Sequence, residues 1–199
     1  MKKTLALFAA VAAVVAAPAF AQDAKPDAGT YNFDPDHSAI VFDYSHMGFS
    51  ESFGFIRGVT GTVTLDPADP TKSTVEASFP LSSVITMAPG LDEHMRGKDL
   101  FNDAEGKGVI SFKSTKVEVD DDGDEAKVTG DMTLNGVTKP VTLDVDLNKS
   151  APNPMSNKPS VGFDAEGKIL RSDFNLGFLA PAVGDEIEFK IGVEASKAD

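Results

Sequence analysis

The chain has 199 residues, no cysteine and a formal net charge of −13. The absence of cysteine excludes disulfides, thiolate metal sites and a cysteine nucleophile, and the acidic charge disfavours nucleic acids and anionic membrane surfaces as partners. A chain of this length suits one domain with a full core.

The first residues have the parts of a secretory signal peptide. Two lysines follow the initial methionine, an apolar run covers residues 5–17, and Ala19-Phe20-Ala21 is a small-x-small cleavage pattern. We therefore expect residues 1–21 to be removed and residues 22–199 to form the mature domain in the periplasm, without stable membrane insertion. Losing the two lysines changes the net charge from −13 to −15. An uncleaved N-terminal anchor is the alternative, although the run is short for a membrane span.

Apolar and polar residues alternate along most of the remaining sequence, which is typical of strands with one buried face. In the clearest case, Ile187, Phe189 and Ile191 alternate with Glu188 and Lys190. We predict strands at residues 30–33, 38–45, 53–65, 73–84, 109–119, 125–134, 141–148, 161–170 and 184–195. Turn residues separate them at 34–36, 66–70, 120–124 and 135–136, with a longer loop at 150–160.

The pattern predicts an all-β domain, a single antiparallel barrel or sandwich of about eight strands, with one short helical segment near residues 89–100. An eight-stranded barrel has an interior that side chains just fill, or that holds one small ligand. Of the 14 phenylalanines, twelve follow residue 21, and the chain has no tryptophan. Such rings offer apolar surface without polar groups and suit a long hydrocarbon ligand. A dry core filled by these rings is the alternative.

Polar motifs give little support to catalysis or metal binding. His37, His46 and His94 have carboxylates nearby but lack the spacing of a metal site. The acidic run at residues 120–125 lacks the ligand pattern of an EF-hand. No serine lies in a Gly-x-Ser-x-Gly elbow, and no phosphate-binding or dinucleotide motif occurs. We expect a protein that is not an enzyme and has no metal and no cofactor.

The three arginines are the only guanidinium groups in a chain with 31 acidic residues; they are Arg57, Arg96 and Arg171. Arginine suits bidentate contacts with phosphate or carboxylate, so one of them could hold a ligand head group. An internal ion pair, such as Arg171 with Asp173, is the alternative for each.

Five motifs follow one another in a distinctive order. They are Asp36-His37-Ser38 followed by Phe42, His46 and Gly48; residues 92–96 with Asp99-Leu100-Phe101; residues 110–114; residues 129–141; and Arg171-Ser172-Asp173-Phe174. Together they resemble the YceI family, over about residues 29–195. The chain departs from the family pattern at Leu91, where arginine is frequent, at Leu100 and at Asn175. Leu91 removes one polar contact expected near a ligand head group.

The resemblance implies a lipocalin-like barrel that holds a polyisoprenoid or an isoprenoid-quinone-like amphiphile. Members of the family are commonly exported to the periplasm and are linked to isoprenoid quinones or stress responses. We therefore expect a carrier whose partner is a long-chain isoprenoid or related lipid. The expected cavity wall comprises Phe42, Phe53, Phe55, Phe79, Phe112, Met132, Phe163, Phe174 and Phe189. The expected head-group contacts are His37, His46, His94, Arg96 and Arg171.

Two other functional classes fit the sequence. A lipid-modifying enzyme would use His94 with Asp92. A stress-related interaction protein with a filled core would bind a protein partner and no lipid. A homodimer is compatible with each class.

Overall fold

The computed structural model describes residues 25–199, except residue 104 and residues 121–124. The expected signal peptide, residues 1–21, lies outside the described residues. The described chain forms strands β1 (Gly29–Phe33), β2 (Ala39–His46), β3 (Ser50–Arg57), β4 (Thr60–Leu65), β5 (Thr74–Pro80), β6 (Val84–Thr86), β7 (Val109–Val119), β8 (Glu125–Leu134), β9 (Val137–Pro152), β10 (Pro159–Leu170) and β11 (Glu186–Lys197). Helix α1 (Pro89–Arg96) and the short 3-10 helices η1 (Pro70–Lys72), η2 (Leu81–Ser83) and η3 (Arg171–Phe174) complete it.

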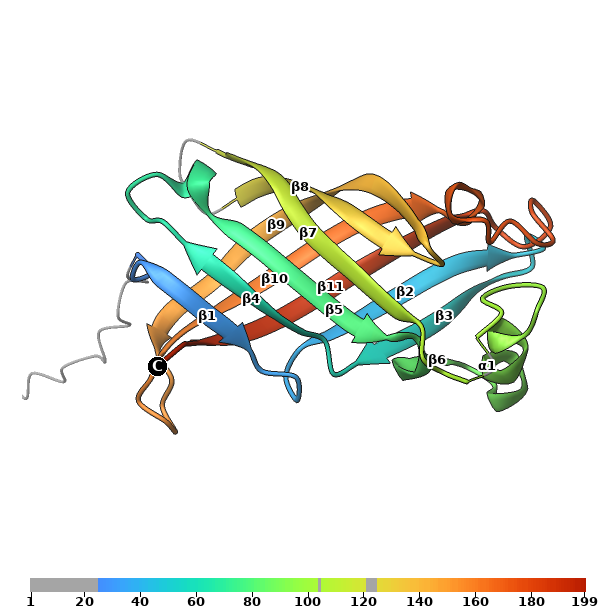
Figure 1. Ribbon diagram of the computed structural model, residues 1–199, viewed down its shortest axis with the longest axis horizontal. Coiled ribbons are helices and arrows are strands. Elements are labelled where there is room, and N and C mark those ends of the chain that lie inside the picture. Colours follow the sequence, from blue (N-terminus) through green and yellow to red (C-terminus); the bar gives the residue numbers. More distant parts are fainter. Residues whose placement is uncertain (1–24, 104, 121–124) are drawn as a thin grey trace, which may run out of the picture.

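The strands form one antiparallel sheet that closes on itself. Its order is β1-β4-β5-β7-β8-β9-β10-β11, and β1 also pairs with β11, so these eight strands make a ring. Strands β2, β3 and β6 continue the sheet beyond β11 and lengthen the barrel at the end that carries α1 (Figure 1). The expected all-β, eight-stranded antiparallel barrel with one short helix is therefore confirmed. Closure leaves no free sheet edge in the ring, and it encloses an interior.

At three places in the sheet, two consecutive strands occur where one long strand could have run. Strands β1 and β2 both pair with β11, at residues 195–197 and 188–192 respectively. Strands β3 and β4 separate at Gly58, which has a φ of +70°, and β5 and β6 separate at η2. The prediction of single strands at 53–65 and 73–84 was wrong, because a left-handed residue or a 3-10 turn interrupts a β-ladder.

Two tight turns connect β8 to β9 and β9 to β10. Asn135 and Gly136 both have positive φ, at 51° and 73°, as a two-residue hairpin turn requires. The predicted turn at this site is confirmed. At the opposite end of β9, Asn153 Oδ1 accepts hydrogen bonds from the N–H groups of Met155 and Ser156, at 2.9 and 3.1 Å. This tight turn lets β9 and β10 continue well into the region predicted as a loop.

Helix α1 is shorter than predicted, because it ends at Arg96 rather than near residue 100. Its proline at the first turn has the φ angle that a helix start requires. Asp92 Oδ1 accepts hydrogen bonds from the N–H and hydroxyl of Thr86, at 2.7 and 2.6 Å, and so holds α1 against the end of β6. None of the helices in the described ranges has the length and apolar character needed to cross a membrane.

Buried apolar side chains form two clusters within the barrel. The larger cluster includes Ile56, Phe79 and Phe174 and joins β3, β5 and η3 to neighbouring strands. The smaller cluster joins β1, β4, β10 and β11 through Tyr31, Val63, Val161 and Ala195. Half-buried inward-facing side chains pack against both clusters, and together with buried members of the larger cluster they line the candidate site.

Candidate functional site

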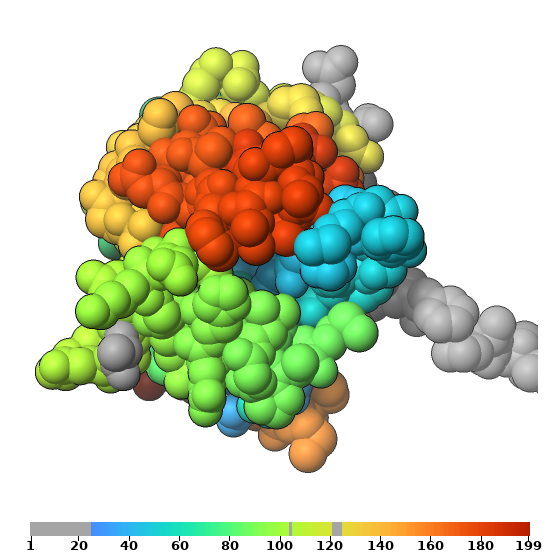
Figure 2. All heavy atoms as spheres, turned by 90° about the vertical axis from the view of Figure 1, so that its right-hand side faces the viewer, coloured from blue at the N-terminus to red at the C-terminus, as the bar shows by residue number. Residues whose placement is uncertain are grey.

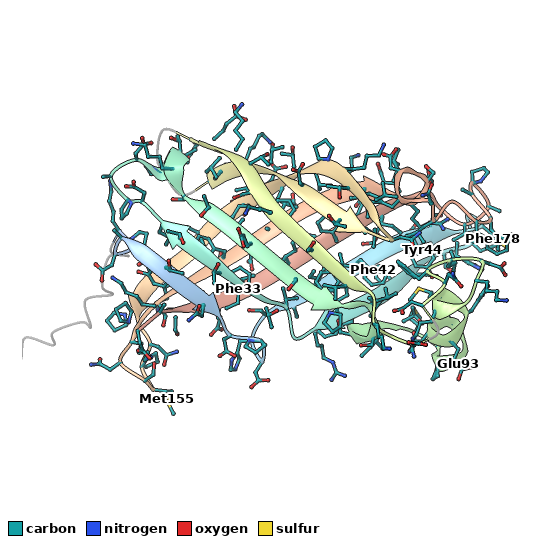
Figure 3. The ribbon with its side chains drawn as sticks, viewed as in Figure 1. Phe33, Phe42, Tyr44, Glu93, Met155 and Phe178 are labelled. Carbon is teal, nitrogen blue, oxygen red and sulfur yellow. The ribbon has the colours of Figure 1, made fainter. Side chains whose placement is uncertain are left out.

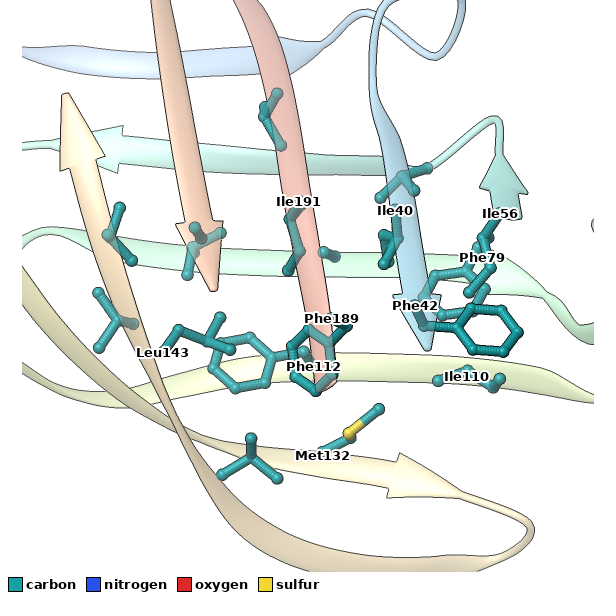
Figure 4. Close-up of a pocket in the computed structure, with 18 of the residues that line it drawn as sticks. Ile40, Phe42, Ile56, Phe79, Ile110, Phe112, Met132, Leu143, Phe189 and Ile191 are labelled. Carbon is teal, nitrogen blue, oxygen red and sulfur yellow. The ribbon is translucent and has the colours of Figure 1, made fainter. Parts of the chain in front are cut away.

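A cavity of about 1010 Å³ occupies the barrel interior and reaches toward both ends. This volume lies at the upper end of the usual range for ligand pockets, about 300–1,000 Å³. The middle of its wall is apolar and comes from the inward positions of at least six strands (Figure 4). The labelled lining residues are Ile40, Phe42, Ile56, Phe79, Ile110, Phe112, Met132, Leu143, Phe189 and Ile191.

Part of the inward-facing wall is only half-buried, whereas other members, such as Ile40 and Phe79, are buried. On β11, Ile187, Phe189 and Ile191 are half-buried, while the alternating Glu188 and Lys190 are exposed on the outer face. Side chains that face a packed interior are normally buried on all sides, because protein cores are close-packed. The half-burial of this inner row shows that it borders open space. The barrel interior is thus a cavity, and the filled dry core considered from the sequence is wrong for this region.

Glycines on neighbouring strands make room for phenylalanine rings of the wall. The pairs are Gly54 with Phe42, Gly130 with Phe112, and Gly167 with Phe189. A Cβ atom on Gly54 would lie 2.0 Å from Cζ of Phe42, a distance that no side chain can accept. The ring of Phe42 therefore lies close over the backbone of β3, as glycine alone permits. Rings held against the wall in this way leave more of the interior open.

Three segments surround the cavity at one end, and we call them the mouth. They are the β2–β3 hairpin around residues 46–50, residues 87–108 with α1, and residues 171–185. Figure 2 looks onto this end and shows the three segments meeting there, with deeper atoms of β2 visible between them. The polar or titratable side chains that line the cavity here are Tyr44, His46, Ser52, His94 and Arg171.

Contacts between the segments hold the mouth together. The N–H of Met47 donates to the carbonyl of Ala182 at 2.7 Å, which ties the β2–β3 hairpin to residues 171–185. Helix α1 approaches the same segment through His94, whose ring lies edge-on to that of Phe178 with centroids 6.2 Å apart. Tyr44 and Phe178 are both labelled at this end in Figure 3. This ring contact joins α1 to the 171–185 segment.

Arg171 holds the 171–185 segment in its fold. Its Nε donates to the carbonyl of Gly184 at 2.8 Å, Nη1 to that of Leu176 at 2.6 Å, and Nη2 to that of Val183 at 2.9 Å. Burial lowers the pKa of its guanidinium from the ordinary value, while nearby Asp185 opposes that effect. The expected alternative partner, Asp173, pairs instead with Lys139 at 3.8 Å. Most of the donors of Arg171 are therefore engaged by the backbone.

Polar groups also line the cavity at the end away from the mouth, and they include Lys25, Asp66, Glu125, Lys149 and Ser150. The wall between the two ends is mainly apolar, although Ser111 on β7 also lines it. An amphiphile with a long apolar chain fits this distribution of polarity, because its chain can lie in the middle and its polar end at either opening.

Six of the nine predicted wall residues line the cavity: Phe42, Phe79, Phe112, Met132, Phe163 and Phe189. Phe53 and Phe55 do not, because Gly54 and Ile56 take the inward positions of β3 and place both phenylalanines on the outer face. Phe174 lies outside the lining as well, since it is packed in the larger core cluster on η3. These three residues are therefore removed from the expected wall.

Three of the five predicted head-group residues line the cavity, and all three are at the mouth: His46, His94 and Arg171. Arg96 is on α1 but outside the lining. His37 lies on the surface between β1 and β2, with its Nδ1 2.8 Å from Oδ2 of Asp34. This hydrogen bond raises the pKa of His37 and lowers that of Asp34. His37 and Arg96 are therefore corrected to positions outside the cavity.

The aliphatic part of the wall was not among the residues predicted from the sequence, which were mainly phenylalanines. The aliphatic wall residues include Ile40, Ile110, Leu143, Val145, Ile191 and Val193. A signal for them existed, since Ile191 and Val193 share the alternating face of Phe189. Once one inward residue of a strand is fixed, every second residue shares its face.

The arrangement does not assemble the catalytic pair considered from the sequence. Oδ1 of Asp92 is engaged by Thr86, and the described ring contact of His94 is with Phe178 rather than with Asp92. Within residues 25–199, leaving aside 104 and 121–124, no three His, Asp or Glu side chains gather closely enough to hold a metal ion. What the geometry offers is an enclosed apolar surface with polar ends.

Comparisons with known proteins agree with this architecture. The sequence profile of the YceI-like domain matches residues 31–195. Protein YceI of Escherichia coli O157:H7 is 37% identical over 169 residues, which are 84% of this chain and 86% of that protein. The crystal structure of the Campylobacter jejuni YceI protein aligns with a TM-score of 0.67 and 27% identity, over 78% of this chain and 90% of that one.

A polyisoprenoid binding domain from Saccharophagus degradans has a similar fold. It aligns with a TM-score of 0.62 over 86% of this chain and 100% of that one. At 14% identity the similarity extends to the fold alone. From the profile match and the Escherichia coli relative, the chain belongs to the YceI-like domain family.

Proposed function

We propose that the protein is a carrier that holds a long-chain isoprenoid lipid or an isoprenoid quinone inside the barrel. We further propose that it acts in the periplasm after removal of residues 1–21, and that it performs no catalytic step and needs no cofactor. The observation that carries the proposal is the cavity of about 1010 Å³, whose mainly apolar wall includes half-buried side chains such as Phe42, Phe112 and Phe189. Covering such an apolar surface with an apolar molecule removes it from water and is therefore favourable.

The energetics favour a long hydrocarbon. Burial of apolar surface contributes about 25 cal/mol per Å², so about 400 Å² of buried ligand surface would contribute about 10 kcal/mol. Part of this is offset by the lost freedom of the ligand. The wall is mainly apolar between its two ends, which favours a chain without oxygen or nitrogen atoms there, because such atoms would be buried with few partners. The description of the Saccharophagus degradans domain as polyisoprenoid binding is consistent with this ligand class.

We assign the head group to the mouth. His46 and His94 line the cavity there, and each imidazole can donate a hydrogen bond to a quinone oxygen or a phosphate, or donate to or accept from a hydroxyl. Tyr44 and Ser52 add two hydroxyl groups. Arg171 supports the site by holding the surrounding loop, since its donors are largely engaged.

Native mass spectrometry of the protein purified from the periplasm of its own host tests the proposal, followed by organic extraction of the same sample. The expected result is a discrete adduct that extracts as an isoprenoid quinone or a polyprenyl species. A mass equal to that of the unliganded chain, unchanged after incubation with polyprenol and ubiquinone, would overturn it. A specific protein partner in the same purification would then support the interaction protein.

A further inference from the structure

Exposed apolar side chains are concentrated on the loops of the mouth. Phe49 at the tip of the β2–β3 hairpin is 89% exposed. Met47 lies beside it, Met87 precedes α1, and Phe178 and Leu179 lie in the 171–185 segment, all well exposed. We call these five residues the mouth rim. At the opposite end of the barrel, the described loops carry one large exposed apolar residue, Met155 (Figure 3).

The mouth rim is continuous with the cavity. Phe178 and Leu179 belong both to the exposed rim and to the cavity lining, so apolar surface runs from the outside into the interior. The three segments that carry the rim come from distant parts of the sequence and meet around one opening (Figure 2). Exposed apolar groups gathered in this way mark a contact site rather than the scattered exposure of ordinary surfaces.

We propose that the mouth rim docks on the surface of a lipid bilayer, with the opening facing the membrane, so that the cargo lipid passes between bilayer and barrel without crossing water. This inference rests on the proposed carrier function. An amphiphile with a long apolar chain resides in membranes, and its transfer through water would expose that chain at about 25 cal/mol per Å². A rim inserted at the interface removes this barrier.

The charges around the rim favour an uncharged bilayer surface. The exposed acids on or beside the rim segments are Glu51, Glu93, Asp99, Glu105 and Asp173, and the bases there include Lys98, Lys107 and the half-buried Arg96. These charges of both signs give no basic patch, and the whole chain is acidic, with a net charge of −13. Attachment through apolar side chains therefore accounts for binding, while anionic lipids would repel the chain.

Two residues of the rim allow a clean test, because Phe49 and Met87 do not line the cavity. The Phe49→Ser/Met87→Ser variant removes rim surface and leaves the ligand wall intact. Met155→Ser is the matched control, since Met155 is 93% exposed but lies at the other end. Each protein is measured by flotation with phosphatidylcholine vesicles, and the rate of polyprenol transfer from these vesicles into the protein is recorded beside the final loading.

The double variant should bind vesicles about tenfold more weakly and load about tenfold more slowly, while its final loading matches that of the parent. Met155→Ser should match the parent in all three measurements. Equal vesicle binding and equal loading rate for parent and double variant would overturn docking and leave the carrier function standing. No loading of any protein would instead count against the carrier function. Stronger binding to phosphatidylglycerol vesicles, or a parent dimer that the double variant loses, would also overturn docking at a neutral bilayer.

Discussion

A single carboxylate on the cavity wall should separate ligand binding from folding. Val145 lines the cavity from β9, and the residues opposite it on β8 and β10 are Ala126 and Ala165. Neither side chain can donate a hydrogen bond, so the carboxylate of Val145→Asp would have no partner across the strands once a hydrocarbon covers it. In the unliganded barrel the position is only half-buried, and water can solvate the charge.

The expected magnitude follows from this difference. Burying an unpaired carboxylate costs several kcal/mol, and a value of about 4 kcal/mol weakens binding roughly a thousandfold. The free energy of unfolding should fall by only about 1 kcal/mol, as for an ordinary substitution. The charged form is disfavoured in the complex, so ligand raises the pKa of the new carboxyl. The binding deficit should therefore be full at neutral pH, shrink as pH falls through this raised pKa, and be smallest below about 3.9.

Polyprenol titration followed by native mass spectrometry measures the affinity, and urea unfolding measures the stability. Val145→Thr is the control for shape, and Thr142→Asp places the same charge on the outer face of β9. Both controls should bind within a few-fold of the parent. If Val145→Asp binds polyprenol as tightly as Val145→Thr at neutral pH, the ligand does not cover this wall and the reasoning is refuted.

Three further substitutions test individual contacts. Gly54→Ala places a Cβ 2.0 Å from the Phe42 ring and should lower the free energy of unfolding by about 1–3 kcal/mol in urea titration, whereas Gly90→Ala, with no atom within 4 Å, should not lower it. Arg171→Lys cannot reproduce the hydrogen bonds to four carbonyls, so the free energy of unfolding should fall by about 2 kcal/mol and proteolysis within residues 171–185 should become faster. An unchanged cleavage pattern would contradict the role of Arg171. Asp34→Asn should return the raised pKa of His37 toward its ordinary value in an NMR titration. The contribution of the Asp34–His37 pair to the free energy of unfolding is present below the unfolded pKa of histidine and is lost as pH rises through the raised pKa of folded His37. A His37 titration that Asp34→Asn leaves unchanged would contradict the pairing.

The limits of sequence analysis are clearest on β3. Alternation placed Phe53 and Phe55 together on one face, which is correct, but their size suggested that this face was the inner one. The pairing of β3 with β2 sets Gly54 opposite Phe42 and turns the glycine inward. A period of two fixes which residues share a face, and only the pairing partners decide which face is inside. On β11 the inner face could be predicted from the sequence, because the other face carries the charged residues Glu188 and Lys190.

Arg171 shows a second limit. Its charge and rarity made it a candidate for a ligand head group or for an ion pair with Asp173. In the structure its donors reach four carbonyls of the loop that follows it. A loop folded around a guanidinium leaves no periodic pattern in the sequence, because the contacts depend on the path of the backbone rather than on residue type.

The sequence by itself determined the all-β class, the two faces of most strands, the turn at Asn135-Gly136 and the resemblance to the YceI family, since these depend on local periodicity and on residues in fixed order. Only the tertiary structure decided that the interior is open, that β1 pairs with β11 to close the ring, and that the mouth gathers His46, His94 and Arg171. These features depend on strand number, register and long-range pairing. A barrel of the same strands is hollow or filled according to how far its walls stand apart, and no single stretch of sequence contains that distance.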